Sequence, residues 1–239
     1  MMLRLHSLAL AGAAIGLIAA KPAALAMDKD NPSCPAAPDW GQAKAIALSA
    51  ADRNGKHVLI ADGIIDSTLP KRLKAALDVD ERIEEVWIKS RGGDARAGNL
   101  AGKVIRSYPG MVTRIPKGWT CFSACNFLFM GGDRRFVDPG GVFMVHMFTH
   151  TGDRDTIEIS VEEGSAETTR LIGQIEQDSA LLASEDNDFL IRMGISRKLL
   201  TEVMYKQQAV ATAANKTTRY CLSQDEVRKY NVVPKETAG

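Results

Sequence analysis

The feature that most constrains the fold is a strand followed by a turn and a helix, which recurs along the middle of the chain. Residues 85–90 form a short apolar run typical of a strand, and apolar residues then recur at helical spacing over 97–107. The same order of strand, turn and helix recurs with a strand at 111–115 and an apolar helix at 124–130. Residues 142–148 are predicted to be a further strand. Repeated alternation of this kind predicts an α/β fold, with a mainly parallel sheet covered by helices.

The flanking sequence predicts further helices. Residues 40–54 are rich in alanine and favour a helix, and a β-compatible run follows at 57–62. Residues 157–194 are heavily charged with an intermittent apolar stripe, which indicates a long, partly solvated helix that projects from the body. Arg134-Arg135 is interpreted as a solvated turn.

The N-terminal residues have the pattern of a cleaved secretory signal. Arg4 precedes a short run of Ala, Leu, Ile and Gly, and Ala24-Leu25-Ala26 supplies small residues at the cleavage site. We therefore expect a signal peptide at 1–26, an N-terminal linker or extension at 27–56, a single α/β domain at 57–234 and a tail at 235–239. The mature protein is predicted to be periplasmic or secreted.

Composition limits the partners. The chain has 239 residues and a net charge of +1, without the basic excess that nucleic-acid binding requires. After residue 30 no apolar run is long enough to span a bilayer, so no stable membrane span is expected once the signal is cleaved.

Four cysteines are expected to form disulfides in an exported protein. They are Cys34, Cys121, Cys125 and Cys221, and they allow three complete pairings. A bond between Cys121 and Cys125 is expected to be strained across a turn into a helix, which favours bonds from Cys34 or Cys221 to the region around Ser123. No closely spaced Cys-x-x-Cys pair is present, so a zinc site is not predicted. No other metal and no cofactor are predicted.

Ser123 and His146 are the candidate catalytic pair. Ser123 follows a predicted strand and opens an apolar helix, a position that exposes a hydroxyl and directs neighbouring amides at one point. A serine needs an adjacent base to act as a nucleophile, and His146 lies on the next predicted strand. Taken singly, each residue is more often a helix cap or a core histidine. Their combination favours a serine hydrolase.

Gly92-Gly93 are the candidate oxyanion residues. Two glycines directly after a strand let backbone amides approach a ligand closely. Together with the amide of Ala124 they are predicted to hold the negative oxygen of a tetrahedral intermediate. A plain turn is the alternative interpretation.

These motifs resemble the proteolytic subunit of Clp proteases, within the crotonase superfamily. The resemblance covers residues 58–234 in order and is nearest to exported bacterial members with cysteines beside the serine. It rests on four segments: SRGG from Ser90, CFSAC around Ser123 with the following FLFMGGDRR, VHM around His146, and LSQDEV from Leu222 with the following YNVV.

The resemblance implies a crotonase-like spiral of ββα units and peptide or protein substrates. It also implies a homo-oligomer in which the long helix after residue 157 forms a projecting handle. One position departs from the pattern: the family places an aspartate where this chain has Thr218, Arg219 and Tyr220. Asp186 or Asp188 is the suggested replacement for orienting His146, and a Ser-His pair without a carboxylate is the other option.

Two further functions stay open at the level of sequence. The absent aspartate favours a non-catalytic protein that binds peptides or serves as a scaffold. Acyl-CoA chemistry fits a crotonase-like fold but not export, because that cofactor is cytoplasmic. The leading prediction is an exported serine peptidase.

Overall fold

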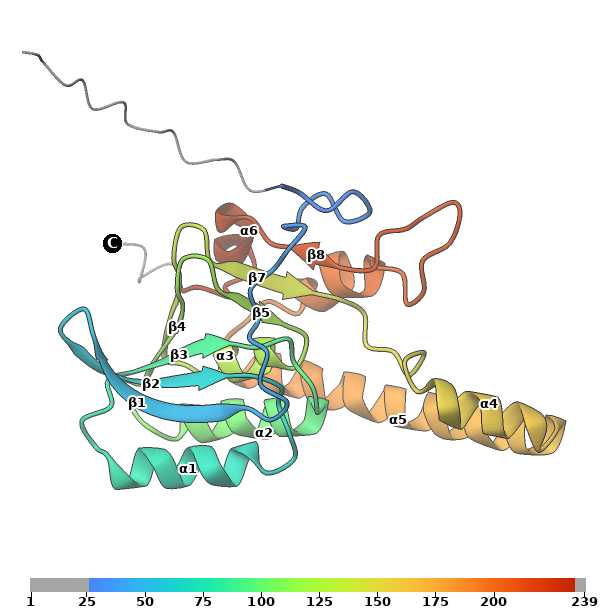
Figure 1. The fold of residues 1–239 in the computed structure, drawn as a ribbon, viewed down its shortest axis with the longest axis horizontal. Helices are drawn as coiled ribbons and strands as arrows, with labels where there is room; N and C mark the ends of the chain where they lie inside the picture. The colour runs from blue at the N-terminus through green and yellow to red at the C-terminus, as the bar shows by residue number, and fades with distance from the viewer. Residues whose placement is uncertain (1–25, 235–239) are drawn as a thin grey trace, which may run out of the picture.

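A computed structural model describes residues 26–234, which form two β-sheets, a set of covering helices and a helical projection (Figure 1). The first sheet has five strands in the order β1-β2-β3-β4-β6, antiparallel between β1 and β2 and parallel elsewhere. Its strands are β1 (Ala47–Arg53), β2 (Lys56–Asp62), β3 (Glu85–Lys89), β4 (Val112–Ile115) and β6 (Arg134–Val137). The predicted α/β class is confirmed.

The second sheet has three strands in the order β5-β7-β8. They are β5 (Thr120–Phe122), β7 (Val142–Val145) and β8 (Tyr220–Cys221), with β5 parallel to β7 and β8 antiparallel to it. A single parallel bridge between Ser90 and Cys121 links the two sheets. The ends of β3 and β5 therefore meet at one place.

Three helices connect the strands. They are α1 (Leu69–Val79), α2 (Ala95–Arg106) and α3 (Cys125–Met130), and α1 and α2 cover one face of the five-stranded sheet (Figure 1). All six residues of α3 are buried. Gly98 and Gly102 of α2 face the carbonyl oxygens of Ala124 and Phe127 so closely that an added Cβ would lie 2.5 and 2.3 Å from them. This close packing fixes α3 against α2.

The predicted long helix is two helices. α4 (Arg154–Glu162) ends before Gly164, which has a φ of 104°, and α5 (Ser165–Arg192) runs back along it (Figure 1). The prediction of one continuous helix over 157–194 was wrong because glycine permits this reversal. The pair extends away from the sheets, as expected of a projection. A short π and 3-10 helical segment (Leu199–Val203 and Met204–Lys206) and α6 (Gln224–Lys229) complete the order.

Residues 40–54 contain a strand and no helix, contrary to the prediction. β1 pairs with β2 through a tight turn in which Asn54 and Gly55 both have positive φ, 53° and 76°. Asn-Gly with this geometry is the preferred two-residue hairpin turn, and its backbone twist matches the twist of the flanking strands. The turn outweighs the helical preference of alanine.

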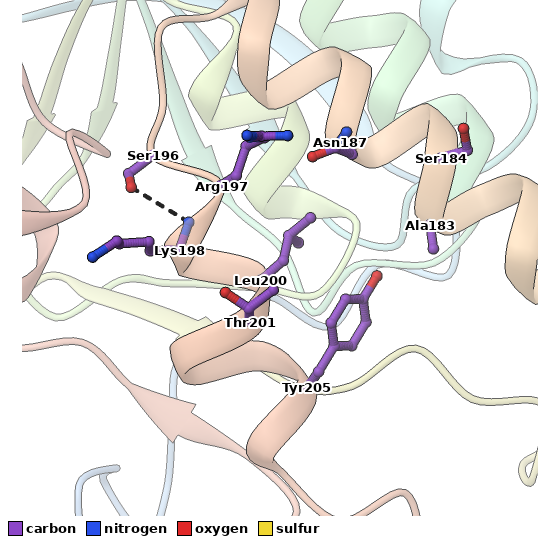
Figure 2. A pocket seen from close by; sticks show the side chains of 9 residues that line it. All are labelled: Ala183, Ser184, Asn187, Ser196, Arg197, Lys198, Leu200, Thr201 and Tyr205. Atoms are coloured by element: carbon purple, nitrogen blue, oxygen red, sulfur yellow. Dashed lines mark hydrogen bonds between the residues drawn. The ribbon is translucent and has the colours of Figure 1, made fainter.

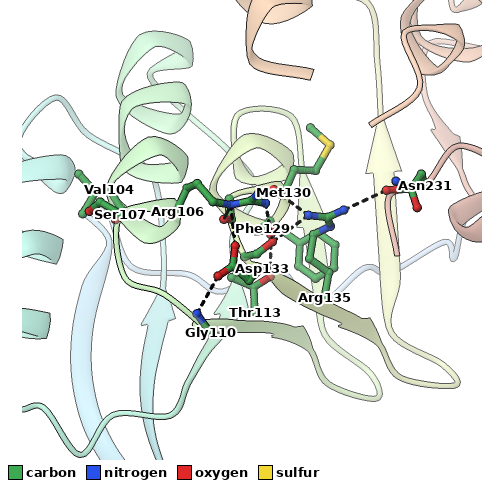
Figure 3. Close-up of polar contacts among 12 residues, drawn as sticks. Val104, Arg106, Ser107, Gly110, Thr113, Phe129, Met130, Asp133, Arg135 and Asn231 are labelled. Carbon is green, nitrogen blue, oxygen red and sulfur yellow. Dashed lines mark hydrogen bonds and ion pairs between the residues drawn. The ribbon is translucent and has the colours of Figure 1, made fainter. Parts of the chain in front are cut away.

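Arg135 is buried, although a solvated turn was predicted for it. It lies in β6 with 2% of its surface exposed, and its guanidinium donates to the carbonyl oxygens of Gly132 and Val232. It also donates to the carbonyl oxygen of Asn231 (Figure 3). Burial lowers the pKa of Arg135 to about 10. This side chain connects the C-terminal segment to the end of α3, and an anion-binding role is not needed to explain it.

The prediction that the four cysteines form disulfides is confirmed, but the favoured pairing was wrong. The structure pairs Cys121 with Cys125 and Cys34 with Cys221. The first pair is compatible with disulfide geometry because the chain reverses at Ser123, which leaves the two Cα atoms 5.3 Å apart. The second bond attaches the N-terminal segment to β8.

Some predictions concern residues outside the described range. The predicted signal peptide lies there except for Ala26, and so does the predicted tail at 235–239. Within residues 26–234, no helix is both long and apolar enough to cross a membrane.

Candidate active site

The candidate site lies where the two sheets meet. Gly92 and Gly93 follow β3, Ser123 follows β5, and His146 follows β7 by one residue. Since β5 and β7 are parallel neighbours, their carboxyl ends lie side by side. The bridge between Ser90 and Cys121 brings the end of β3 to the same edge. The order of the strands therefore brings residues that are far apart in the sequence to one place.

Ser123 occupies a sharp turn between β5 and α3. Its φ is 61°, an unusual value for a residue with a side chain, and its carbonyl oxygen accepts a hydrogen bond from the amide of Asn126. The turn directs Oγ of Ser123 to Nε2 of His146, at a distance of 2.7 Å. A nucleophile and a base within hydrogen-bonding distance are the minimal requirement for a serine hydrolase.

The environment of His146 favours the neutral imidazole. Burial lowers its pKa below the usual value of 6.5, and a hydrogen bond with the backbone of Met147 opposes that shift. The ring also packs against Phe122, with 4.8 Å between ring centroids, and Trp40 stacks on Phe122 at 5.8 Å. A neutral ring at pH 7 is able to accept the proton of Ser123. This aromatic contact from Trp40 was not predictable from the sequence, because no local pattern links residues 40, 122 and 146.

The three candidate oxyanion amides are not equivalent. The amide of Gly92 donates to Oγ of Ser90 at 3.0 Å and is therefore occupied. The amides of Gly93 and Ala124 have no hydrogen-bond acceptor among residues 26–234. Two available amides beside Ser123 are sufficient to hold an oxyanion.

Gly92 makes a close approach that no other residue type fits. Its φ is 87°, and an added Cβ would lie 2.6 Å from Cβ of Ser123 and 2.7 Å from the carbonyl oxygen of Phe122. Contacts under 3 Å with backbone atoms require displacement of one segment. The glycine pair thus packs directly on the turn that carries Ser123.

No carboxylate among the described residues hydrogen-bonds to His146. At the position where the resemblance places an aspartate, the amides of Thr218 and Arg219 donate to Oδ1 of Asn31, at 2.9 and 3.0 Å. The side chain of Arg219 pairs with Asp28. The N-terminal segment therefore occupies the region where an orienting aspartate was sought.

The two suggested replacements are engaged elsewhere. Asp188 is exposed and pairs with Arg192 at 2.9 Å. Asp186 is buried and accepts a long hydrogen bond of 3.5 Å from Asn99. The structure brings neither of them to His146.

A cavity of about 300 Å³ lies between α5 and the segments that follow Gly93 and His146 in the sequence. Its walls start with Asp94, one residue after Gly93, and Phe148, two residues after His146, and α5 closes the far side. The remaining lining residues are Ala95, Arg96, His150, Asp178 and Leu182. Its mixture of apolar and charged groups suits a side chain of an extended substrate.

A larger cavity of about 700 Å³ lies at the base of α5 (Figure 2). It is lined by α5 residues, among them Asn187, and by Arg197, Thr201 and Tyr205 of the segment that follows. Neither Ser123 nor His146 borders it. Ser123 and His146 do not line the smaller cavity either, but its lining includes Asp94 and Phe148, which follow Gly93 and His146 closely in the sequence.

Asp186 gives the structure a testable pH dependence. Burial raises its pKa from the usual 3.8 to about 7. Between about pH 4 and pH 7 the folded chain holds a proton that the unfolded chain has released, so the free energy of unfolding is expected to decrease as pH rises through this range, by at most about 4 kcal/mol.

Asp186→Asn is expected to remove most of that decrease. Urea unfolding at pH 5 and pH 8 measures it, and Asp188→Asn, an exposed change on the same helix, is the control. An equal pH dependence in wild type and Asp186→Asn would contradict the assignment.

Comparisons with known proteins show similarity in shape at low sequence identity. No family profile matches the chain, and no curated protein matches its sequence. Among solved structures, ClpP1 from Listeria monocytogenes is 15% identical, with 73% of this chain and 86% of that chain covered and a TM-score of 0.47.

Two other solved structures show comparable similarity. A membrane-bound stomatin-specific protease is 14% identical, with 72% and 73% covered and a TM-score of 0.44. An enoyl-CoA hydratase from Shewanella pealeana is 11% identical, with 78% and 66% covered and a TM-score of 0.44. At these values the similarities establish no activity for this chain.

Proposed function

We propose that the protein is an exported serine hydrolase, specifically a peptidase, in which Ser123 is the nucleophile and His146 the base. The observation that carries the proposal is the 2.7 Å contact between Oγ of Ser123 and Nε2 of His146 at a turn with positive φ. Such contacts and such backbone conformations are each uncommon, and their coincidence is typical of an activated nucleophile. The amides of Gly93 and Ala124, which have no hydrogen-bond acceptor among residues 26–234, supply the third part of such a site, an oxyanion hole.

The reaction follows from this geometry. Oγ of Ser123 attacks the carbonyl carbon of a peptide bond while its proton passes to Nε2 of His146. The amides of Gly93 and Ala124 hold the resulting oxyanion. His146 then gives its proton to the leaving amine as the C–N bond breaks, and an acyl group stays on Ser123. Water, deprotonated by His146, releases the acyl group and restores the serine.

Extended peptides or unfolded proteins are the proposed substrates. The cavity of about 300 Å³ is lined by Asp94, the residue after Gly93, and by Phe148, two residues after His146, and it has room for a substrate side chain. We also propose that residues 57–234 are the catalytic domain and that α4 and α5 serve in homo-oligomer formation, as the Clp-like sequence motifs suggest. The two disulfides are in keeping with a periplasmic or secreted protein.

A non-catalytic peptide-binding protein is the second candidate. It is favoured by one observation, the absence of a carboxylate partner for His146 among residues 26–234. Removal of the orienting carboxylate from such a triad leaves a weakened but measurable enzyme, so the observation does not by itself favour binding over slow catalysis.

Peptide cleavage separates the two candidates. The purified mature protein is incubated with a mixture of unstructured peptides, and new termini are identified by mass spectrometry. New termini with wild type and none with Ser123→Ala are expected. If both proteins bind peptides equally and neither produces new termini, the peptidase proposal is wrong and the binding function is favoured.

A further inference from the structure

The Cys121–Cys125 disulfide encloses the turn that carries Ser123. Cys121 lies within β5, Cys125 is the first residue of α3, and the serine is midway between them. The bond therefore joins the strand before the nucleophile to the helix after it. Only Phe122, Ser123 and Ala124 lie inside the closed loop.

Without a constraint, the backbone of the turn at Ser123 is expected to relax. The φ of 61° at Ser123 is unfavourable for a residue with a Cβ atom, and Asn54 and Asn231 are the other non-glycine residues with positive φ in the described range. Asparagine tolerates this conformation better than serine does. A change at this one backbone position would turn Oγ away from Nε2 of His146.

The bond is inaccessible to reductants in the folded protein. Both cysteines are 0% exposed and belong to the main hydrophobic core. A disulfide that acts as a redox switch is reached by a thiolate, which attacks one sulfur directly. Burial of both sulfurs thus favours a permanent constraint over a switch.

The loop is also too short for its main effect to be on global stability. In the chain-entropy account, a disulfide stabilises the folded state more when it closes a longer loop. The sequence separation is 4 for Cys121–Cys125 and 187 for Cys34–Cys221. The Cys34–Cys221 bond is therefore expected to contribute more to the free energy of unfolding. This difference favours a local role for the Cys121–Cys125 bond.

We propose that Cys121 and Cys125 are positioning residues, whose disulfide holds Ser123 in the left-handed turn and so maintains its hydrogen bond to His146. The effect on catalysis rests on the proposed serine hydrolase function. The effect on the geometry of Ser123 does not, because it concerns one backbone angle and one hydrogen bond.

The test compares two variants that lack the Cys121–Cys125 bond with a matched control that lacks the other disulfide. Cys121→Ala/Cys125→Ala removes the constraint, and Cys121→Val/Cys125→Ala removes it while refilling part of the core space. Cys34→Ala/Cys221→Ala removes the other disulfide. Thermal melts define a temperature at which the compared proteins are folded, and all measurements are made there.

Two readouts are needed. The first is peptide hydrolysis resolved into kcat and KM, and the second is the ¹⁵N NMR signal of the His146 ring, which reports the hydrogen bond to Ser123 whether or not the protein is an enzyme. For the variants at 121 and 125 we expect kcat to fall about 10- to 100-fold with KM little changed, since a displacement near 1 Å has effects of that size. We also expect their His146 signal to shift towards that of Ser123→Ala.

The control pair is expected to show the opposite combination. Its melting temperature should fall more than that of the variants at 121 and 125, while its kcat changes less than about threefold and its His146 signal stays at the wild-type position. Failure of both variants at 121 and 125 to fold, while the control folds, would overturn the proposal, because the bond would then be a folding requirement.

A wild-type His146 signal and wild-type kcat in a folded variant at 121 and 125 would also overturn it. If wild type itself cleaves no peptide but the His146 signal shifts as expected, the positioning role stands and the peptidase function fails.

Discussion

Peptide hydrolysis is expected to fall at least ~1,000-fold when Ser123 is replaced by alanine, and by a similar factor when His146 is replaced by glutamine. Alanine removes the attacking oxygen. Glutamine is able to hydrogen-bond to Ser123 but does not accept a proton near pH 7. Because the two residues act as one unit through the 2.7 Å contact, the double variant should be no slower than either single variant.

Steady-state rates of the three variants against wild type measure this non-additivity. The residual rate should be the same in all three, since the amides of Gly93 and Ala124 persist. Losses that multiply in the double variant would show that the two side chains act independently and would contradict the proposed pair.

Gly92→Ala is expected to lower the hydrolysis rate about 100-fold, although Gly92 itself contacts no substrate atom in the proposed mechanism. Its new Cβ would lie 2.6 Å from Cβ of Ser123 and 2.7 Å from the carbonyl oxygen of Phe122. Neither atom is the mobile end of a flexible side chain, so the turn itself is displaced. A displacement near 1 Å at the nucleophile is sufficient for a loss of this size.

Gly110→Ala is the matched control for that change. Gly110 has a similar φ, 78° against 87°, but no atom lies within 4 Å of its added Cβ. Both variants carry the backbone cost of about 1–2 kcal/mol for a left-handed alanine, and only Gly92→Ala meets the nucleophile turn. Hydrolysis rates and unfolding free energies of the two are compared. Equal rates would mean that Gly92 does not position Ser123.

The central units of the fold were predictable because their sequence is locally consistent. Residues 85–90 and 97–107 show a change from strand to helix periodicity, and the structure has β3 and α2 there. The same holds for the region from 111 to 130, where β4 and α3 form. Ser123 was singled out by its placement after a predicted strand and His146 by its placement on the next one, and the parallel pairing of β5 with β7 explains why they meet.

Features set by a turn or by distant contacts were not predictable. The alanine-rich residues 47–53 form β1 because Asn54-Gly55 closes a hairpin, a local signal that alanine content obscured. The burial of Arg135 depends on carbonyl oxygens of residues 231 and 232, about 100 positions away. The Cys121–Cys125 bond depends on the φ of Ser123, a value that sequence spacing does not reveal.

The surroundings of His146 depend on the N-terminal segment. Trp40 stacks on Phe122, which packs against the His146 ring, and Asn31 accepts hydrogen bonds from the amides of Thr218 and Arg219. The contacts of Asn31 join residues almost 190 positions apart, and no local sequence pattern reveals them. The packing of Phe122 on the His146 ring agrees with a neutral imidazole whose pKa is lowered by burial.

The central claim is that Ser123 is a nucleophile activated by His146, and covalent labelling with a fluorophosphonate tests it most directly. The mature protein is treated with the reagent at pH 7.5 beside a known serine hydrolase, and the adduct is located by peptide mass spectrometry. We predict one adduct, on Ser123, absent from Ser123→Ala and formed at least ~1,000-fold more slowly in His146→Gln. A wild-type protein that labels no faster than Ser123→Ala, under conditions that label the reference hydrolase, would contradict the claim.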